Sequence, residues 1–527
     1  YERSDHPVIP TVPLIMSSPT FPPLPLPPGI TESYLPSHDL TYHVLSAGDP
    51  SKPLLLCLHG FPELAFSWRK IMPQLASQGY HVVAYDQRGY GRTTGWDTRP
   101  FHQVDLNTFS FARLIRDAVI LVNALGYKSV DCVLGHDFGA VGASICALMR
   151  PDIFKSVVIM SHPFKGPPSL PFAITSPNYN PPPSKPDIHT DLAKLPEPRK
   201  HYKWYYSTAP AASEMDNPAG EPLHTFLRGY FHLKSADWQG NNPQPLQSWC
   251  APELAKLPYY YVMPLHSSMR EAVSLDMRNE NKDLVQEKSS RWLPDPDLAI
   301  YVREWSRTGF QGGLNWYRVA TTEGGMKNVG LFAGKKIEVP MLFLSGRKDW
   351  GTYQEPGVVE KMAETCEKGC FKGVEIVEGA GHWVQQEQPE RVVEIVSRFL
   401  WDNKVEGISI VSVYCPSPIP KIPAFTYSSL SSSLHIMQAL HPVAVLTAGP
   451  VVVPVSTPTH VAPALFVVPP EYTVGPGATY VDMAVWILIR IPGSVAWYAP
   501  GKETSDGEAL PPPVTVIWSV GDNSEYM

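Results

Sequence analysis

Short apolar runs alternate with helical patterns along most of this 527-residue chain. Apolar residues repeat at helical spacing over 111–125, just before Gly126, and again over 392–399, just after Pro389. The runs between such segments are typical of strands buried on both faces, and they lie at 54–58, 81–85, 130–134, 156–160, 341–344 and 374–377. This alternation predicts an α/β fold with a mostly parallel sheet flanked by helices.

The alternation stops between about Phe164 and Ala320 and resumes at Pro340. The intervening block contains a proline cluster at 181–183 and many aromatic residues. A β/α series that is interrupted and then continued implies an inserted domain, and we expect a mainly helical cap over the carboxyl edge of the sheet. The expected boundaries are 29–163 and 321–403 for the two parts of the core and 164–320 for the cap.

Both ends of the chain differ from this pattern. Residues 1–28 are rich in proline and predict an extended arm. Between Gly407 and Pro470 the only acidic or basic residue is Lys421, prolines recur, and neither helical nor alternating periodicity persists. We therefore assign no fold to residues 404–527 and expect them to be irregular or disordered.

The net charge of −7 argues against nucleic acid or an anionic membrane surface as a partner. No segment offers the ~20 apolar residues that a membrane-spanning helix needs. The chain begins at Tyr1 without a basic region followed by an apolar stretch, so no signal peptide is expected. We expect a cytoplasmic protein.

The seven cysteines are odd in number and scattered, which indicates a reduced protein. Cys366 and Cys370 have the spacing of half a zinc site, but no second pair follows at zinc spacing. We therefore expect no bound metal.

The sequence Gly-His-Asp-Phe-Gly-Ala at 135–140 directly follows an apolar run and precedes a helical stretch at 141–149. Strand, sharp turn and helix form the setting of a nucleophile elbow, with Asp137 in the place of the nucleophile. Gly135 and Gly139 relieve crowding around a residue that the elbow holds in a strained conformation. The alternative is that Asp137 is only a helix N-cap.

The sequence His-Gly-Phe-Pro at 59–62 ends the strand at 54–58. In an elbow of this kind one oxyanion-hole N–H comes from this loop, and the other comes from the residue after the nucleophile. The expected donors are thus the backbone amides of Phe61 and Phe138. Pro62 has no N–H and can only shape the turn.

Several further residues of the two loops serve their shape rather than the chemistry. His59 and His136 occupy positions that fit the loops themselves, so we assign them structural roles. The supporting set comprises His59, Gly60, Pro62, Gly135, His136 and Gly139.

A general base and its orienting acid are expected later in the chain, in the order nucleophile, acid, histidine. His382 lies in Gly-Ala-Gly-His-Trp after the run at 374–377 and before the last helix. Asp349 follows the run at 341–344, where its carboxylate can hold the tautomer of His382 and stabilise its charged form.

These motifs resemble those of the α/β-hydrolase superfamily members that have an aspartate nucleophile, chiefly epoxide hydrolases and haloalkane or haloacid dehalogenases. The resemblance rests on the motifs at 59–62, 135–140, 346–349 and 379–383. It covers about residues 29–403, including the structural turn Asp-Gln-Arg-Gly-Tyr-Gly at 86–91, and does not extend to 404–527.

Two segments of the expected cap favour the epoxide hydrolase branch. The sequence at 313–318 is similar to the segment that bears a ring-opening tyrosine, which implies Tyr317. The segment at 201–206 is similar to the one that bears the second, for which Tyr202 matches best and Tyr205 and Tyr206 are rivals. The alternative is that these tyrosines are ordinary aromatic residues of the cap core.

The resemblance implies an enzyme that converts a small apolar epoxide and water to a vicinal diol through an ester of Asp137, without cofactor or metal. A dehalogenase with the same nucleophile is the alternative, although such enzymes usually place Trp or Arg after the nucleophile and Phe138 offers no comparable group. A non-catalytic ligand-binding protein on the same fold is a second alternative.

Overall fold

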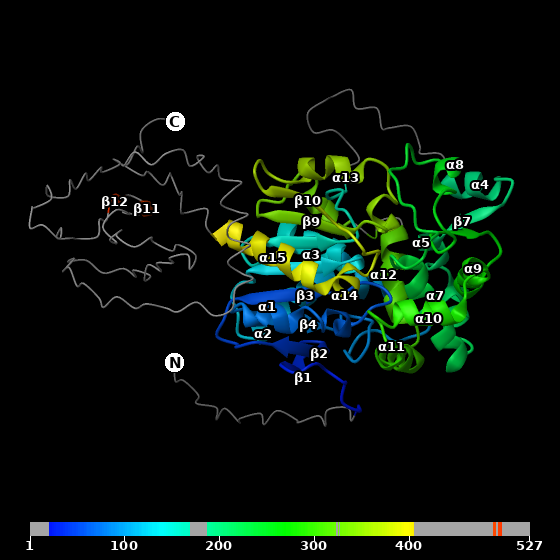
Figure 1. Ribbon diagram of the computed structural model, residues 1–527, viewed down its shortest axis with the longest axis horizontal. Coiled ribbons are helices and arrows are strands. Elements are labelled where there is room, and N and C mark those ends of the chain that lie inside the picture. Colours follow the sequence, from blue (N-terminus) through cyan, green and yellow to red (C-terminus); the bar gives the residue numbers. More distant parts are fainter. Residues whose placement is uncertain are drawn as a thin grey trace, which may run out of the picture. The chain divides into compact units, whose positions relative to one another are not determined.

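The computed structural model describes residues 21–168, 187–322, 325, 327–404, 488–491 and 494–497 (Figure 1). The chain divides into two units, Tyr1–Asn403 and Lys404–Met527. In the second unit β11 (Leu488–Ile491) and β12 (Ser494–Trp497) form an antiparallel pair. Apart from this pair and Lys404, which ends a helix, the predicted irregular tail lies outside the described residues, as do residues 1–20 of the predicted arm.

An eight-stranded sheet lies at the centre of the first unit, with strand order β1-β2-β4-β3-β5-β6-β9-β10 (Figure 1). The strands are β1 (Ile30–Ser37), β2 (Leu40–Ala47), β3 (Leu54–Leu58), β4 (His81–Tyr85), β5 (Cys132–His136), β6 (Val157–Met160), β9 (Met341–Gly346) and β10 (Phe371–Val377). β1, β2 and β4 pair antiparallel, and the remaining neighbours pair parallel. Every residue of β3, β4, β5, β6 and β9 is buried, as expected for parallel strands covered on both faces.

Helices of the core surround this sheet (Figure 1). They are α1 (Met72–Ser77), α2 (Phe111–Ala124), α3 (Phe138–Met149), α13 (Val358–Lys361), α14 (Val384–Glu387) and α15 (Pro389–Lys404). Gly126, which follows α2, has a φ of 86° that favours glycine, and Pro389 is the first residue of α15. Short 3-10 helices lie at Ala65–Trp68, Leu106–Phe109, Val329–Phe332, Trp350–Thr352 and Met362–Thr365.

The cap lies between β6 and β9 and is mainly helical (Figure 1, green). Its helices are α4 (Ile188–Ala193), α5 (Tyr202–Tyr205), α6 (Ala209–Asp216), α7 (Glu221–Lys234), α8 (Ala251–Leu254), α9 (Met269–Met277), α10 (Lys282–Ser289), α11 (Asp295–Thr308) and α12 (Gln311–Thr321). A two-stranded ribbon, β7 (Arg199–His201) with β8 (Val262–Pro264), completes it. The proline cluster at 181–183 lies outside the described residues.

The predicted strand at 130–134 is displaced by two residues. Val130 makes only an isolated bridge to Phe154, and β5 instead runs to His136, which pairs with Met160 of β6. The strand thus continues up to the elbow itself. The following helix also begins earlier than the predicted 141, because α3 starts at Phe138 immediately after Asp137.

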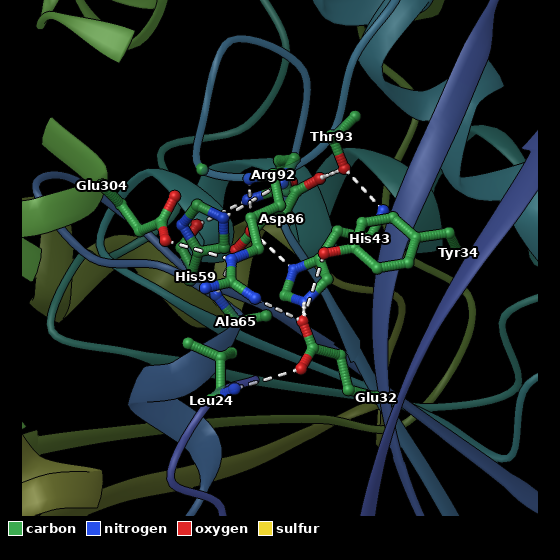
Figure 2. Close-up of polar contacts among 12 residues, drawn as sticks. Leu24, Glu32, Tyr34, His43, His59, Ala65, Asp86, Arg92, Thr93 and Glu304 are labelled. Atoms are coloured by element: carbon green, nitrogen blue, oxygen red, sulfur yellow. Dashed lines mark hydrogen bonds and ion pairs between the residues drawn. The ribbon is translucent and has the colours of Figure 1, made fainter. Parts of the chain in front are cut away.

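A buried polar cluster anchors the turn after β4 to the edge of the sheet (Figure 2). The Asp86 carboxylate accepts hydrogen bonds from the backbone amides of Ala65, at 2.9 Å, and Arg92, at 2.8 Å. Nδ1 of His43 on β2 lies 2.7 Å from the same carboxylate. Asp86 therefore ties the loop after β3, which carries residues 59–62, to strand β2.

The same cluster joins the core to the cap (Figure 2). The Arg92 guanidinium lies 2.6 Å from Glu32 of β1 and 3.0 Å from Glu304 of α11. All three side chains are buried or half-buried. Because breaking a buried pair leaves an uncompensated charge, this contact resists separation of α11 from the core.

Candidate active site

Asp137 occupies the sharp turn between β5 and α3, with φ 54° and ψ −118°. Its side chain makes no capping hydrogen bond, which argues against the helix N-cap interpretation. The turn is crowded by backbone, since a Cβ on Gly139 would lie 2.0 Å from the Leu58 carbonyl oxygen, and one on Gly135 2.2 Å from that of Gly139. Only glycine fits at these two positions, and the resulting strain is typical of functional turns.

Asp137, His382 and Asp349 come together at the carboxyl ends of β5, β10 and β9. Nε2 of His382 lies 3.4 Å from Oδ2 of Asp137, and Nδ1 lies 3.0 Å from Oδ1 of Asp349. All three are buried, and within the described residues Nε2 of His382 has no hydrogen-bond partner. The imidazole is thus held at one nitrogen and available for proton transfer at the other.

Both carboxyl groups of this triad favour the ionised form. Burial opposes the charge of Asp137, but the 3.4 Å contact with His382 and the charges of His382, Lys234 and His136 hold its pKa well below the usual range. Burial also opposes the charge of Asp349, but His382 and the Gly351 amide lower its pKa. Asp137 is therefore a carboxylate at neutral pH, as a nucleophile requires.

The Phe61 amide donates a hydrogen bond to Oδ1 of Asp137 at 3.0 Å. Phe138 is the first residue of α3, where backbone amides have no partner within the helix. The carbonyl oxygen of Pro62 accepts a hydrogen bond from Nε1 of Trp305 at 2.9 Å, so a cap helix holds the loop. Of the two amides expected to form an oxyanion hole, that of Phe61 contacts the carboxyl group of Asp137, and that of Phe138 follows Asp137 directly in the chain.

The two histidines assigned structural roles are completely buried. Nε2 of His59 accepts a hydrogen bond from the Gln87 amide at 3.1 Å. Nδ1 of His136 lies 2.5 Å from Oε2 of Glu63, and its Nε2 lies 2.6 Å from the His382 carbonyl oxygen. His136 therefore connects a buried carboxylate to the backbone of the base.

Tyr317 of α12 lies with its ring edge-on to the rings of Phe138, at 4.6 Å, and Phe61, at 5.6 Å. It is buried, and burial together with the negative charge of Asp137 raises the pKa of its hydroxyl well above the usual value. The hydroxyl thus remains protonated and able to donate at neutral pH.

Tyr202, at the start of α5, has its ring 5.9 Å from that of Tyr317. Burial and the charge of Asp137 likewise raise the pKa of its hydroxyl, whose contact with Gln354 is long, at 3.4 Å. The Tyr205 hydroxyl donates to Glu214 at 2.5 Å, whereas that of Tyr206 lies 3.3 Å from the Tyr230 hydroxyl, a contact about as long as that of Tyr202. The bond to Glu214 argues against Tyr205, and the charge of Asp137 that acts on the Tyr202 hydroxyl argues for Tyr202 as the partner of Tyr317.

Two residues that contact the His382 segment were not predicted from the sequence. Glu63 accepts hydrogen bonds from the side-chain amides of Gln385 and Gln386, both at 2.9 Å, besides its contact with His136. The carbonyl oxygen of Lys234 accepts the His382 amide at 2.8 Å. The position of Glu63 directly after the His-Gly-Phe-Pro motif could have indicated a role at the site. No feature of the sequence around Lys234 indicated one.

In the part of the chain that the structure describes, no cluster of His, Cys, Asp and Glu side chains has the arrangement of a metal site. Cys366 is instead buried with its sulfur 3.5 Å from that of Met341. Over the same residues, no helix is both long and apolar enough to cross a membrane.

Comparison with known proteins places this chain in a family. Residues 53–191 match the alpha/beta hydrolase fold family. The chain is 31% identical over 371 residues to epoxide hydrolase A of Mycobacterium tuberculosis, an alignment that covers 70% of this chain and 97% of the relative. Epoxide hydrolase B of the same organism is 28% identical, with 67% and 93% covered.

Solved structures agree. The crystal structure of epoxide hydrolase A from Mycobacterium thermoresistibile superimposes with a TM-score of 0.52 at 29% identity, covering 71% of this chain and 98% of that one. Potato (Solanum tuberosum) epoxide hydrolase I gives a TM-score of 0.50 at 25% identity, with 71% and 99% covered. With its fold, its elbow and these relatives in agreement, the chain belongs to the epoxide hydrolase family of α/β-hydrolases.

Proposed function

We propose that this enzyme hydrolyses a small apolar epoxide to a vicinal diol through a covalent ester of Asp137. The observation that carries the proposal is the position of an ionised, buried Asp137 on the elbow, 3.4 Å from His382. The charge of Asp137 also raises the pKa of the hydroxyls of Tyr202 and Tyr317. The many aromatic rings of this region, such as Phe61 and Phe138, suit an apolar substrate.

Ring opening is the first step. A carboxylate oxygen of Asp137 attacks one ring carbon, the bond from that carbon to the epoxide oxygen breaks, and the oxygen takes the electron pair. Tyr202 and Tyr317 hold this oxygen by hydrogen bonds, and one of them gives it a proton. The product is a hydroxyalkyl ester of Asp137 and a phenolate that later regains its proton.

Ester hydrolysis is the second step. Nε2 of His382 takes a proton from water, the hydroxide attacks the ester carbonyl carbon, and the charge on the carbonyl oxygen is stabilised by the amides of Phe61 and Phe138. Asp349 stabilises the imidazolium that forms, through its 3.0 Å contact with Nδ1. As the intermediate collapses, the departing diol oxygen takes a proton from the imidazolium of His382, and the remaining proton of the attacking water returns to the tyrosine phenolate, which restores the carboxylate of Asp137.

The pair of tyrosines favours this reaction over halide displacement. A departing epoxide oxygen needs a proton, which a tyrosine hydroxyl supplies, whereas a halide ion needs only N–H donors or positive charge. The residue after the nucleophile is Phe138, whose ring offers neither.

The replacement His382→Gln tests the proposal by separating the two steps. Ring opening continues without the base, so the protein should gain the mass of one epoxide molecule when mixed with styrene oxide. Peptide mapping should place the added mass on Asp137. The matched variant Asp137→Asn should gain none.

Either of two results would refute the mechanism. Normal turnover by His382→Gln would remove His382 from the role of base. An equal mass gain in Asp137→Asn would show that another residue is alkylated.

A further inference from the structure

Lys234, the last residue of α7, is a buried cation that has no carboxylate partner among the described residues. Only 3% of the residue is exposed. Its ammonium forms no ion pair with any residue that the structure describes, and the one polar side-chain contact is the Tyr230 hydroxyl at 3.4 Å. Because charged groups are rarely buried unpaired, this ammonium calls for an explanation.

Aromatic rings surround the ammonium instead. Its nitrogen lies 4.7 Å from the ring centroid of Tyr261, 5.1 Å from Tyr230, 5.6 Å from Trp383 and 5.7 Å from Tyr260. Ring faces attract a cation, which offsets part of the cost of removing the ammonium from water. They do not neutralise it, so its positive charge acts on its surroundings.

These rings are the neighbours of the tyrosines at the active site. Tyr261 lies 5.1 Å from the ring of Tyr202, and the hydroxyl of Tyr230 lies 3.3 Å from that of Tyr206, whose ring is 4.9 Å from Tyr317. The ammonium therefore lies on the tyrosine side of the site. Its charge also reaches Asp137, but it is a smaller cause of the lowered pKa of that carboxyl than His382 is.

Ring opening moves negative charge toward this side. The charge starts on Asp137, passes to the epoxide oxygen, and ends on the tyrosine that gives up its proton. Burial disfavours a phenolate at Tyr202 or Tyr317, as the raised pKa values of both hydroxyls show. A fixed positive charge nearby offsets that cost, and it acts with little dielectric screening.

We propose that Lys234 assists ring opening electrostatically, its caged ammonium stabilising the negative charge that leaves Asp137 for the tyrosine side. The inference rests on the proposed ester mechanism and adds a residue to it. Lys234 acts through the tyrosines and forms no bond to the substrate.

The test measures ring opening alone. In the His382→Gln background, the rate of ester formation with styrene oxide is followed by quenched-flow mass spectrometry for Lys234→Met and Lys234→Arg. Loss of the charge in Lys234→Met should slow the step by about tenfold or more, and the retained charge in Lys234→Arg should keep it within about threefold. Where Lys234→Met is unstable, Lys234→Gln gives the same comparison.

Lys200→Met is the matched control. Its ammonium also lies over a tyrosine ring of the cap, 4.5 Å from the centroid of Tyr205, but that hydroxyl is engaged by Glu214. Removing this charge should leave ester formation unchanged. The comparison separates a general effect of losing a cap lysine from the effect of Lys234.

Three results would overturn the inference. Unaltered ester formation in Lys234→Met would show that the charge has no effect, and equal losses in folded Lys234→Met and Lys234→Arg would indicate packing. A loss confined to phenylglycidate, an epoxide that carries a carboxylate, and absent for styrene oxide would make Lys234 a substrate anchor. Failure of the ester mechanism itself is distinguishable, because no ester would then form on Asp137 even with Lys234 present.

Discussion

Replacing Tyr202 by Phe should abolish a hydrogen bond that exists only during ring opening. Among the residues that the structure describes, the Tyr202 hydroxyl makes one long contact, 3.4 Å to Gln354, so its removal should change the free energy of unfolding by about 0.5 kcal/mol or less. A donor to a developing oxyanion is worth about 2.7–4 kcal/mol, and each 1.36 kcal/mol is about tenfold in rate. Ester formation should therefore slow by about 10²–10³-fold.

Tyr205→Phe should show the opposite pattern. The Tyr205 hydroxyl donates to the Glu214 carboxylate at 2.5 Å and accepts from the Met269 amide at 3.3 Å. Removing it should cost about 1–2 kcal/mol of stability, since hydrogen bonds to charged groups are the stronger ones. The rate of ester formation should stay within about twofold of normal, because this hydroxyl bonds to Glu214 and Met269 within the cap.

The assay compares both variants, with Tyr206→Phe, by urea unfolding and by the single-turnover rate of ester formation. The reasoning predicts a stable, slow Tyr202→Phe protein and a destabilised, fast Tyr205→Phe protein. A Tyr202→Phe protein that forms the ester at the normal rate, with Tyr205→Phe or Tyr206→Phe slow instead, would refute the assignment.

Three further predictions concern the turn, the polar cluster and the tail. Gly60→Ala would place a Cβ 2.4 Å from Cβ of Asp137, so the free energy of unfolding in urea should fall by about 1–3 kcal/mol and turnover should be reduced. Gly142→Ala should be tolerated, because its Cβ would meet nothing nearer than 3.6 Å. Burial lowers the pKa of His43, but the hydrogen bonds and charges of Asp86 and Glu32 outweigh burial and raise this pKa from 6.5 to about 9. The contribution of protonated His43 to the free energy of unfolding, about 3 kcal/mol, should therefore be complete below pH 6.5 and lost as the pH rises through 9. Urea unfolding across pH should show this decline, and the same decline in a His43→Gln protein would contradict the prediction. We propose that the hydrolase core ends near residue 403, so a chain ending at Lys404 should keep full diol formation and gain solubility; loss of folding or of most activity would show that the tail is integral.

The sequence predicted the fold class because the parallel strands are buried on both faces and read as continuous apolar runs. The central strands β3, β4 and β6 lie where the runs indicated. β1 and β2 were not identified as strands, since β1 is a half-exposed edge strand that does not alternate regularly, and the largely buried β2 includes the polar residues Thr41, His43 and Ser46. Edge strands carry a weak pattern because only part of their surface meets the core.

The candidate triad was accessible from the sequence for a related reason. Asp137, Asp349 and His382 each follow a strand, and the carboxyl ends of parallel strands meet at one edge of the sheet. In the structure His382 lies 3.4 Å from Asp137 and 3.0 Å from Asp349.

The choice among the three tyrosines could not be made from the sequence. Tyr202, Tyr205 and Tyr206 lie within or directly after one short helix, and helix rotation sends their hydroxyls to different partners. Glu63 and Lys234 were hidden for another reason. Their contacts with the His382 segment span more than a hundred positions of the chain, and only the tertiary fold creates them.

One turnover in ¹⁸O-labelled water tests the covalent mechanism most directly. With enzyme in excess over styrene oxide, the incoming water oxygen attacks the ester carbonyl, so the label should be found in the carboxyl group of Asp137. The diol from that turnover should carry an unlabelled oxygen. Label in the diol after a single turnover, with none in Asp137, would mean direct attack of water on the epoxide and would contradict the account.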